Sequence, residues 1–98
     1  MIIVRDVFQA KYGKGGDLVA LFKEAREKWP PRARYGLRIL SDASGSFDTI
    51  VTETQAENLA DWERLRSEVF GMADFSEWFS RMAPLVESGR REFYNVEG

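Results

Sequence analysis

Residues 2–10, IIVRDVFQA, constrain the fold of this chain more than any other segment. They are mostly β-branched and aromatic, which favours a strand. Side chains of a strand point alternately to its two faces, so Ile2, Val4 and Phe8 share one face and Ile3 and Val7 the other. Both faces therefore need to be buried, and we expect this strand in the interior of a sheet.

The rest of the chain predicts two helical regions and three further strands. Apolar residues recur every three or four positions from Leu18 to Trp29, which predicts a helix that ends before Pro30-Pro31. A second helical region starts at an N-cap, Asn58, breaks at Gly71 and resumes after Asp74. The strands are predicted at residues 34–41, 47–53 and 90–96.

The order strand, helix, strand, strand, helix, strand predicts one α+β domain over residues 1–98, with a ferredoxin-like βαββαβ topology. This topology gives a four-stranded antiparallel sheet with the helices on one face and the first and third strands in the centre. The helices cover only one face, whereas the first strand is apolar on both. Two copies packed sheet to sheet would cover the second face, so we expect a homodimer.

The link between the second and third strands predicts a tight hairpin. Residues 42–45, DASG, suit a type I turn with a left-handed glycine, which would place Asp42 opposite Ser46. Arg38 and Asp48 are then diagonal neighbours on one sheet face, where we expect an ion pair at the dimer interface. Binding of an anionic substrate is the alternative role for this pair.

Two residues are candidates for catalysis. The same register puts Glu53 beside an apolar helix layer, which would raise its pKa and let it act as a base. The alternative is a glutamate at the strand end that reaches water. Tyr94 in the last strand is the second candidate.

A set of aromatic residues indicates a ligand pocket between the helices and the sheet. The candidates are Phe8, Phe22, Tyr35, Trp62 and Trp78. A planar organic molecule would find apolar contacts there. Ordinary core packing is the alternative, because a small domain needs large side chains in its core.

Composition excludes many familiar functions. The chain has no Cys and no His, so we expect neither a metal site nor a cofactor. Its net charge of −2 argues against binding to nucleic acid. No stretch approaches the ~20 apolar residues of a membrane span, and no secretory signal is evident, so we expect no membrane partner and a cytoplasmic location.

The block RILSDASGSFDTIVTE, residues 38–53, followed by NLADWERL, resembles NIPSNAP-type proteins of the dimeric α/β-barrel superfamily. The resemblance covers nearly the whole chain and implies ferredoxin-like domains whose sheets pair into a barrel. That superfamily includes antibiotic-biosynthesis monooxygenases and haem-degrading enzymes, for which the resemblance calls for a first-strand asparagine, a second-helix tryptophan and, for haem, a histidine. Here the first strand has Asp6 and Gln9 but no asparagine, and the histidine is absent, so haem degradation is not expected.

We therefore expect a NIPSNAP-like homodimer that binds a small organic ligand or has an auxiliary role, and the sequence leaves open whether it is an enzyme. One alternative is a cofactor-independent monooxygenase acting on an aromatic substrate. In that case Trp62, Trp78 and Tyr94 would shape the pocket and Glu53 would assist deprotonation. Another alternative is a purely structural module with no cavity behind its helices.

Overall fold

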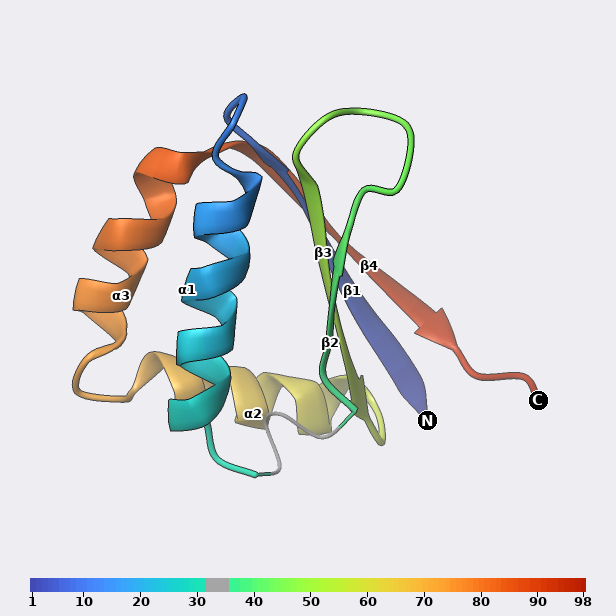
Figure 1. The fold of residues 1–98 in the computed structure, drawn as a ribbon. Coiled ribbons are helices and arrows are strands. Elements are labelled where there is room, and N and C mark those ends of the chain that lie inside the picture. The colour runs from blue at the N-terminus through green and yellow to red at the C-terminus, as the bar shows by residue number, and fades with distance from the viewer. Residues whose placement is uncertain (32–35) are drawn as a thin grey trace.

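The computed structural model describes residues 1–31 and 36–98 and shows one antiparallel sheet with the helices on one of its faces (Figure 1). The strands are β1 (Ile2–Ala10), β2 (Arg38–Ser41), β3 (Thr49–Ala56) and β4 (Val86–Asn95). The helices are α1 (Gly15–Lys28), α2 (Leu59–Phe70) and α3 (Phe75–Met82), followed by a short 3-10 helix, η1 (Ala83–Leu85). The sheet order β2-β3-β1-β4 places β3 and β1 in the centre. The predicted ferredoxin-like βαββαβ topology is confirmed.

The core lies between the sheet and the helices. On α1, Leu18, Leu21, Phe22 and Ala25 are buried, and their three- and four-residue spacing forms one apolar face of that helix. The indole N–H of Trp78 in α3 donates a hydrogen bond of 2.9 Å to the Leu21 carbonyl. This bond ties the two helices together where both pack on the sheet.

The ends of the helices are fixed in different ways. Asn58 caps α2 as predicted, since its side-chain oxygen accepts from the Asp61 amide at 2.8 Å. Asp74 precedes α3 but does not cap it, and its carboxylate pairs with Lys28 at 2.9 Å instead. At α1 the capping group comes from far away in sequence, from Asp48.

Asp48 lies in the turn between β2 and β3, where its backbone has a φ of 61°. Its carboxylate oxygens accept hydrogen bonds from the amides of Gly13 at 2.7 Å and Gly15 at 3.1 Å. Gly15 is the first residue of α1 and Gly13 lies in the turn before it, so the negative charge lies at the positive end of the helix dipole.

The predicted hairpin register is wrong. Asp42 faces Thr49 and donates its amide to the Thr49 carbonyl at 3.0 Å, so the turn is longer than the predicted one. Arg38 consequently lies opposite Glu53. The shift is by an odd number of positions, which exchanges the faces of β2 relative to β3. Arg38 and Asp48 therefore do not form the predicted ion pair. Arg38 pairs with Glu53 instead, and Asp48 accepts from the Gly13 and Gly15 amides.

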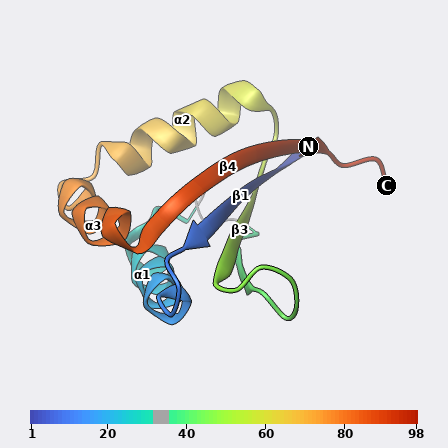
Figure 2. The ribbon, with the colours of Figure 1, turned by 90° about the horizontal axis from the view of Figure 1, so that it is seen from above.

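The opposite side of the sheet, called the open face below, carries no helix among the described residues (Figure 2). It presents the odd-numbered residues of β1 and β3 and, from β2, Arg38 and Leu40, which pair with Glu53 and Val51. Leu40 is 38% exposed. No helix in the described part of the chain is long and apolar enough to cross a bilayer.

Candidate ligand cavity

A cavity of about 240 Å³ lies between the helices and the sheet. Most of its lining is aromatic or aliphatic. The apolar lining residues are Val4, Phe8, Phe22, Trp29, Trp62, Leu65, Val69, Phe70, Phe75, Trp78, Phe79 and Met82. All three tryptophans of the chain are among them.

Four of the five predicted pocket residues, Phe8, Phe22, Trp62 and Trp78, meet at this cavity. The fifth, Tyr35, lies outside the described residues. The ring centroids of Phe8 and Phe22 are 5.2 Å apart, and those of Phe22 and Trp78 are 5.7 Å apart. These contacts link β1, α1 and α3 in one aromatic wall.

The cavity also has a small polar set on its sheet side. Asp6 in β1 accepts two hydrogen bonds from the guanidinium of Arg91 in β4, at 2.7 and 3.2 Å. Thr52 and Thr54 of β3 line the same side. The guanidinium of Arg91 also lies 4.8 Å from the ring centroid of Trp62, so the ion pair and the aromatic wall are in contact.

Sequence reasoning missed Arg91. The pairing of β1 with β4 places it opposite Asp6, and that pairing joins distant parts of the chain. The alternation within RREFYNV was a usable signal, because it places Arg91 and Phe93 on one face. Phe93 does contact Trp62 edge to face, with centroids 5.0 Å apart.

The exposed part of the cavity lining on α2 and α3 is called the entrance below. Most lining residues are buried or half-buried, but Phe70 is 47% and Phe79 48% exposed, and Arg66 and, on β4, Arg91 are also exposed. The guanidinium of Arg66 lies 4.6 Å from the ring centroid of Phe70 and 5.8 Å from that of Trp62. Arg66 therefore makes cation–π contacts with two rings at the entrance.

The structure places Glu53 on the open face, away from the helices. Its carboxylate accepts hydrogen bonds from Arg38 at 2.6 Å and from Arg5 at 2.8 Å. The hydrogen bond from Arg38 is the main cause that lowers the pKa of Glu53; Arg5 adds to it and burial opposes it. The expected base with a raised pKa is therefore wrong, because the register reverses the faces on which that expectation depended.

Tyr94 does not reach the cavity either. It pairs with Ile3 across β1 and β4, and Arg5 lies 5.2 Å from its ring centroid. Tyr94 is 46% exposed on the open face. Both candidates for catalysis thus lie on the far side of the sheet from the aromatic cavity.

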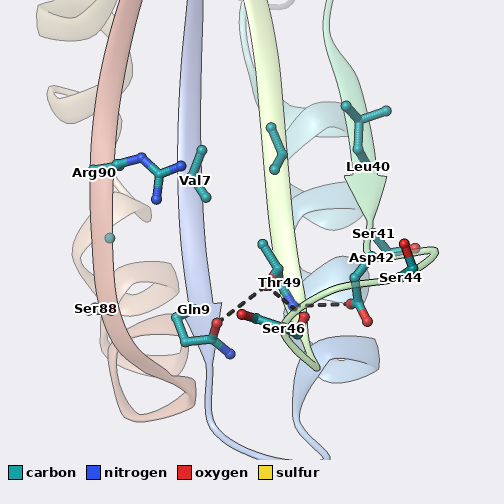
Figure 3. A pocket seen from close by; sticks show the side chains of 12 residues that line it. Val7, Gln9, Leu40, Ser41, Asp42, Ser44, Ser46, Thr49, Ser88 and Arg90 are labelled. Atoms are coloured by element: carbon teal, nitrogen blue, oxygen red, sulfur yellow. Dashed lines mark hydrogen bonds between the residues drawn. The ribbon is translucent and has the colours of Figure 1, made fainter.

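A broader hollow of about 660 Å³ lies on the open face near the β2–β3 turn (Figure 3). Serines of the turn, Thr49, Gln9 and Arg90 line it. Several of its polar groups already bind one another: the Thr49 hydroxyl donates to Gln9 at 3.2 Å, and the Thr49 amide donates to Asp42 at 3.1 Å. The aromatic cavity is therefore the better candidate for a ligand site.

Metal binding has no support in the described part of the chain. No three Asp or Glu side chains there lie close enough together to hold an ion, and the sequence contains no His or Cys. The polar groups of the aromatic cavity are the Asp6–Arg91 ion pair, two threonine hydroxyls and the guanidinium of Arg66, which suit orientation of an organic molecule better than ligation of a metal.

No protein-family model matches the chain, and no curated protein is similar to it. Solved structures do match. A NIPSNAP family protein from Agrobacterium tumefaciens superposes with a TM-score of 0.86 at 16% identity, over 96% of this chain and 90% of that one. An uncharacterised NIPSNAP domain protein from Burkholderia xenovorans gives 0.80 at 12%, over 98% and 94%. A putative antibiotic biosynthesis monooxygenase from Nitrosomonas europaea gives 0.73 at 14%, over 100% of both.

The chain has the NIPSNAP-type fold. The resemblance expected from residues 38–53 is thus confirmed for the architecture, which the NIPSNAP proteins share with the monooxygenase neighbour. At these identities the likeness establishes the fold alone, and the chemistry has to be argued from the residues of the cavity.

Proposed function

We propose that this NIPSNAP-like protein binds a small aromatic molecule in the cavity between its helices and sheet and acts as a homodimer. The observation that carries the proposal is the cavity itself, with an aromatic wall and an Asp6–Arg91 ion pair beside it. Mostly apolar walls with a few fixed polar groups are typical of sites for small organic molecules.

The size of the cavity supports a ligand over plain core packing. The space is about 240 Å³ and some of its lining is exposed, so it has room for a small molecule that a closely packed core would not have. Its rings offer stacking and edge contacts to a planar molecule. The hydroxyls of Thr52 and Thr54 and the Asp6–Arg91 pair supply polar groups that would orient it.

The test is calorimetric titration with a neutral bicyclic aromatic probe, naphthalene-2-carboxamide. We expect one molecule bound per chain. Thr54→Phe, which places a ring in the cavity, should weaken binding at least tenfold, and Trp62→Leu, which removes a wall, should weaken it as well. The control Phe47→Ala removes a ring that is 70% exposed and outside the cavity, and should bind like the unmodified protein. Absence of binding, or equal loss in the control, would contradict the proposal.

A monooxygenase acting on an aromatic substrate is the second candidate function. It is favoured by neighbours described as putative antibiotic biosynthesis monooxygenases, from Nitrosomonas europaea and Chloroflexus aurantiacus, and by the position of Trp62 in the cavity wall. Glu53 and Tyr94 lie on the other face, so the acidic residue available to such a reaction is Asp6.

Of the two functions, only the monooxygenase would transfer an oxygen atom from O₂ to the aromatic substrate. With 1,4-dihydroxynaphthalene and isotopically labelled O₂, an oxygenase would give a product with one labelled oxygen atom, faster than buffer alone. A binding protein would leave the rate at the buffer level. Loss of the labelled product in Trp62→Leu but not in Phe47→Ala would assign the reaction to the cavity.

The homodimer part of the proposal is supported by the open face. The strand register places Arg38, Glu53, Arg5 and Glu92 side by side across the four strands, with charges of alternating sign. Exposed apolar side chains accompany this row, since Leu40 is 38% and Tyr94 46% exposed. A face that mixes apolar groups with balanced charge suits a second copy of itself.

A further inference from the structure

We propose that the ligand of the cavity is an aromatic anion, and that Arg66 binds its carboxylate at the entrance. This inference rests on the proposed function, because it names the chemical class of the molecule that the cavity would hold. It is carried by the charges on the lining residues and by the position of Arg66.

The positive and negative charges of the residues that line the cavity do not cancel. They are one aspartate, Asp6, and two arginines, Arg66 and Arg91. Asp6 and Arg91 neutralise each other through two hydrogen bonds of 2.7 and 3.2 Å. Arg66 forms no ion pair with any residue that the structure describes, so one positive charge at the entrance is left for a ligand.

The position of Arg66 on α2 holds its guanidinium near the entrance. Trp62 and Phe70 are four residues before and after it, so all three side chains lie on one face of the helix. The guanidinium lies 4.6 Å from the Phe70 ring centroid and 5.8 Å from that of Trp62. A guanidinium placed against rings keeps the N–H donors of its plane available for a planar carboxylate.

The same charges set the orientation of the ligand. On the sheet side the cavity offers an anion no free cation, because Arg91 is already paired with Asp6, and most of the remaining lining is aromatic or aliphatic. The favoured arrangement places an uncharged ring system inside and a single carboxylate outside, next to Arg66.

A matched pair of probes tests this orientation. Naphthalene-2-carboxylate and naphthalene-2-carboxamide have the same rings and differ in charge. Calorimetric titration should show the carboxylate binding about tenfold more tightly at low salt, as expected for one partly exposed charge-assisted contact. The preference should shrink as salt is added, because the entrance is exposed to solvent.

Variants then assign the preference to Arg66. Arg66→Gln should reduce affinity for the carboxylate about tenfold and make the two probes equal, while Arg66→Lys should keep a preference for the anion. Lys23→Gln is the matched control: it removes one positive charge from an exposed position of α1 outside the cavity, and should keep the full preference.

The outcomes separate this inference from the proposed function. Equal binding of both probes to the unmodified protein, or a preference that survives Arg66→Gln, would overturn the role of Arg66 while leaving the cavity as a binding site. Absence of binding by both probes would overturn the two proposals together.

Discussion

Glu53 is a buried carboxylate of the sheet that forms ion pairs with two arginines. It is 5% exposed and accepts hydrogen bonds from Arg38 and Arg5, whose side chains remain 67% and 40% exposed. Both arginines favour its charged form. The pKa of Glu53 therefore lies below the ordinary glutamate value in the folded protein.

This shift predicts a specific acid sensitivity. Because the pKa is lowered on folding, the stability from Glu53 is complete at neutral pH and is lost as pH falls below about 4.5, the ordinary value, toward the lowered pKa. Glu53→Gln should cost about 1–2 kcal/mol at pH 7, a figure moderated by solvent around both arginines.

Urea unfolding of the two proteins between pH 7 and pH 3 checks this prediction. Their difference in free energy of unfolding should narrow as pH falls. A difference that stays constant over this range would show that the carboxylate charge of Glu53 contributes nothing.

Two neighbouring glycines give a second residue-scale prediction. A Cβ on Gly15 would lie 2.6 Å from an Asp48 carboxylate oxygen, whereas a Cβ on Gly16 would meet nothing within 4 Å. Gly15→Ala should therefore displace the capping carboxylate and destabilise the protein by about 1–2 kcal/mol. Gly16→Ala should stabilise it by about 0.4–1 kcal/mol, because alanine restricts the unfolded chain. Thermal unfolding of both variants measures the effect, and shifts of the same sign would contradict it.

Helix α1 depends on a turn that is distant in sequence. Asp48 supplies the group that accepts from the Gly13 and Gly15 amides, and no side chain of the loop before α1 does so. The β2–β3 turn and the start of α1 are thus one unit.

Asp48→Ala should destabilise this unit. The expected cost is about 2 kcal/mol, from the lost cap and from a φ of 61° that alanine tolerates poorly. Asp48→Asn should lose less, because asparagine accepts hydrogen bonds and tolerates this conformation. Hydrogen exchange of the Gly13 and Gly15 amides locates the effect; equal protection in all three proteins would argue against it.

Prediction from the sequence succeeded where the signal was local and failed at this unit. The periodicity of Leu18 to Trp29 and the Asn58 cap are local signals, and both predicted their elements correctly. The register of β2 on β3 depended on the turn length. Gly45 fits a short turn, but the observed turn runs up to Thr49, and Asp48 within it binds the start of α1. A contact between distant segments leaves no local pattern.

For the cavity, sequence predicted the aromatic wall and missed the charged residues. Phe8, Phe22, Trp62 and Trp78 stand out as large apolar residues on amphipathic elements, so their side of the sheet could be anticipated. Arg91 could not be predicted as the partner of Asp6, because the two residues are brought together only by the pairing of β1 with β4.

Two copies of this protein should associate through the open face. Analytical ultracentrifugation should give about twice the chain mass of 11.3 kDa, and the buried surface should approach the ~1,600 Å² of a specific complex. Val51→Lys places a charge in the middle of that face and should give a folded monomer. Ala20→Lys, at an exposed position of α1, should leave the dimer intact. A monomeric unmodified protein would refute the prediction.

The pairing of β1 with β4 also sets the order in which the chain can fold. Ile2 pairs with Asn95 and Val4 with Phe93, so the central strand acquires its second neighbour only after the last part of the sequence has been made. Until then one edge of β1 has unpaired backbone N–H and C=O groups, with which other chains can pair during synthesis. Contacts between residues so far apart slow the search for the native state. The sheet of this protein should therefore be completed only after residues 86–95 have emerged from the ribosome, and residues 2–10 need protection until then.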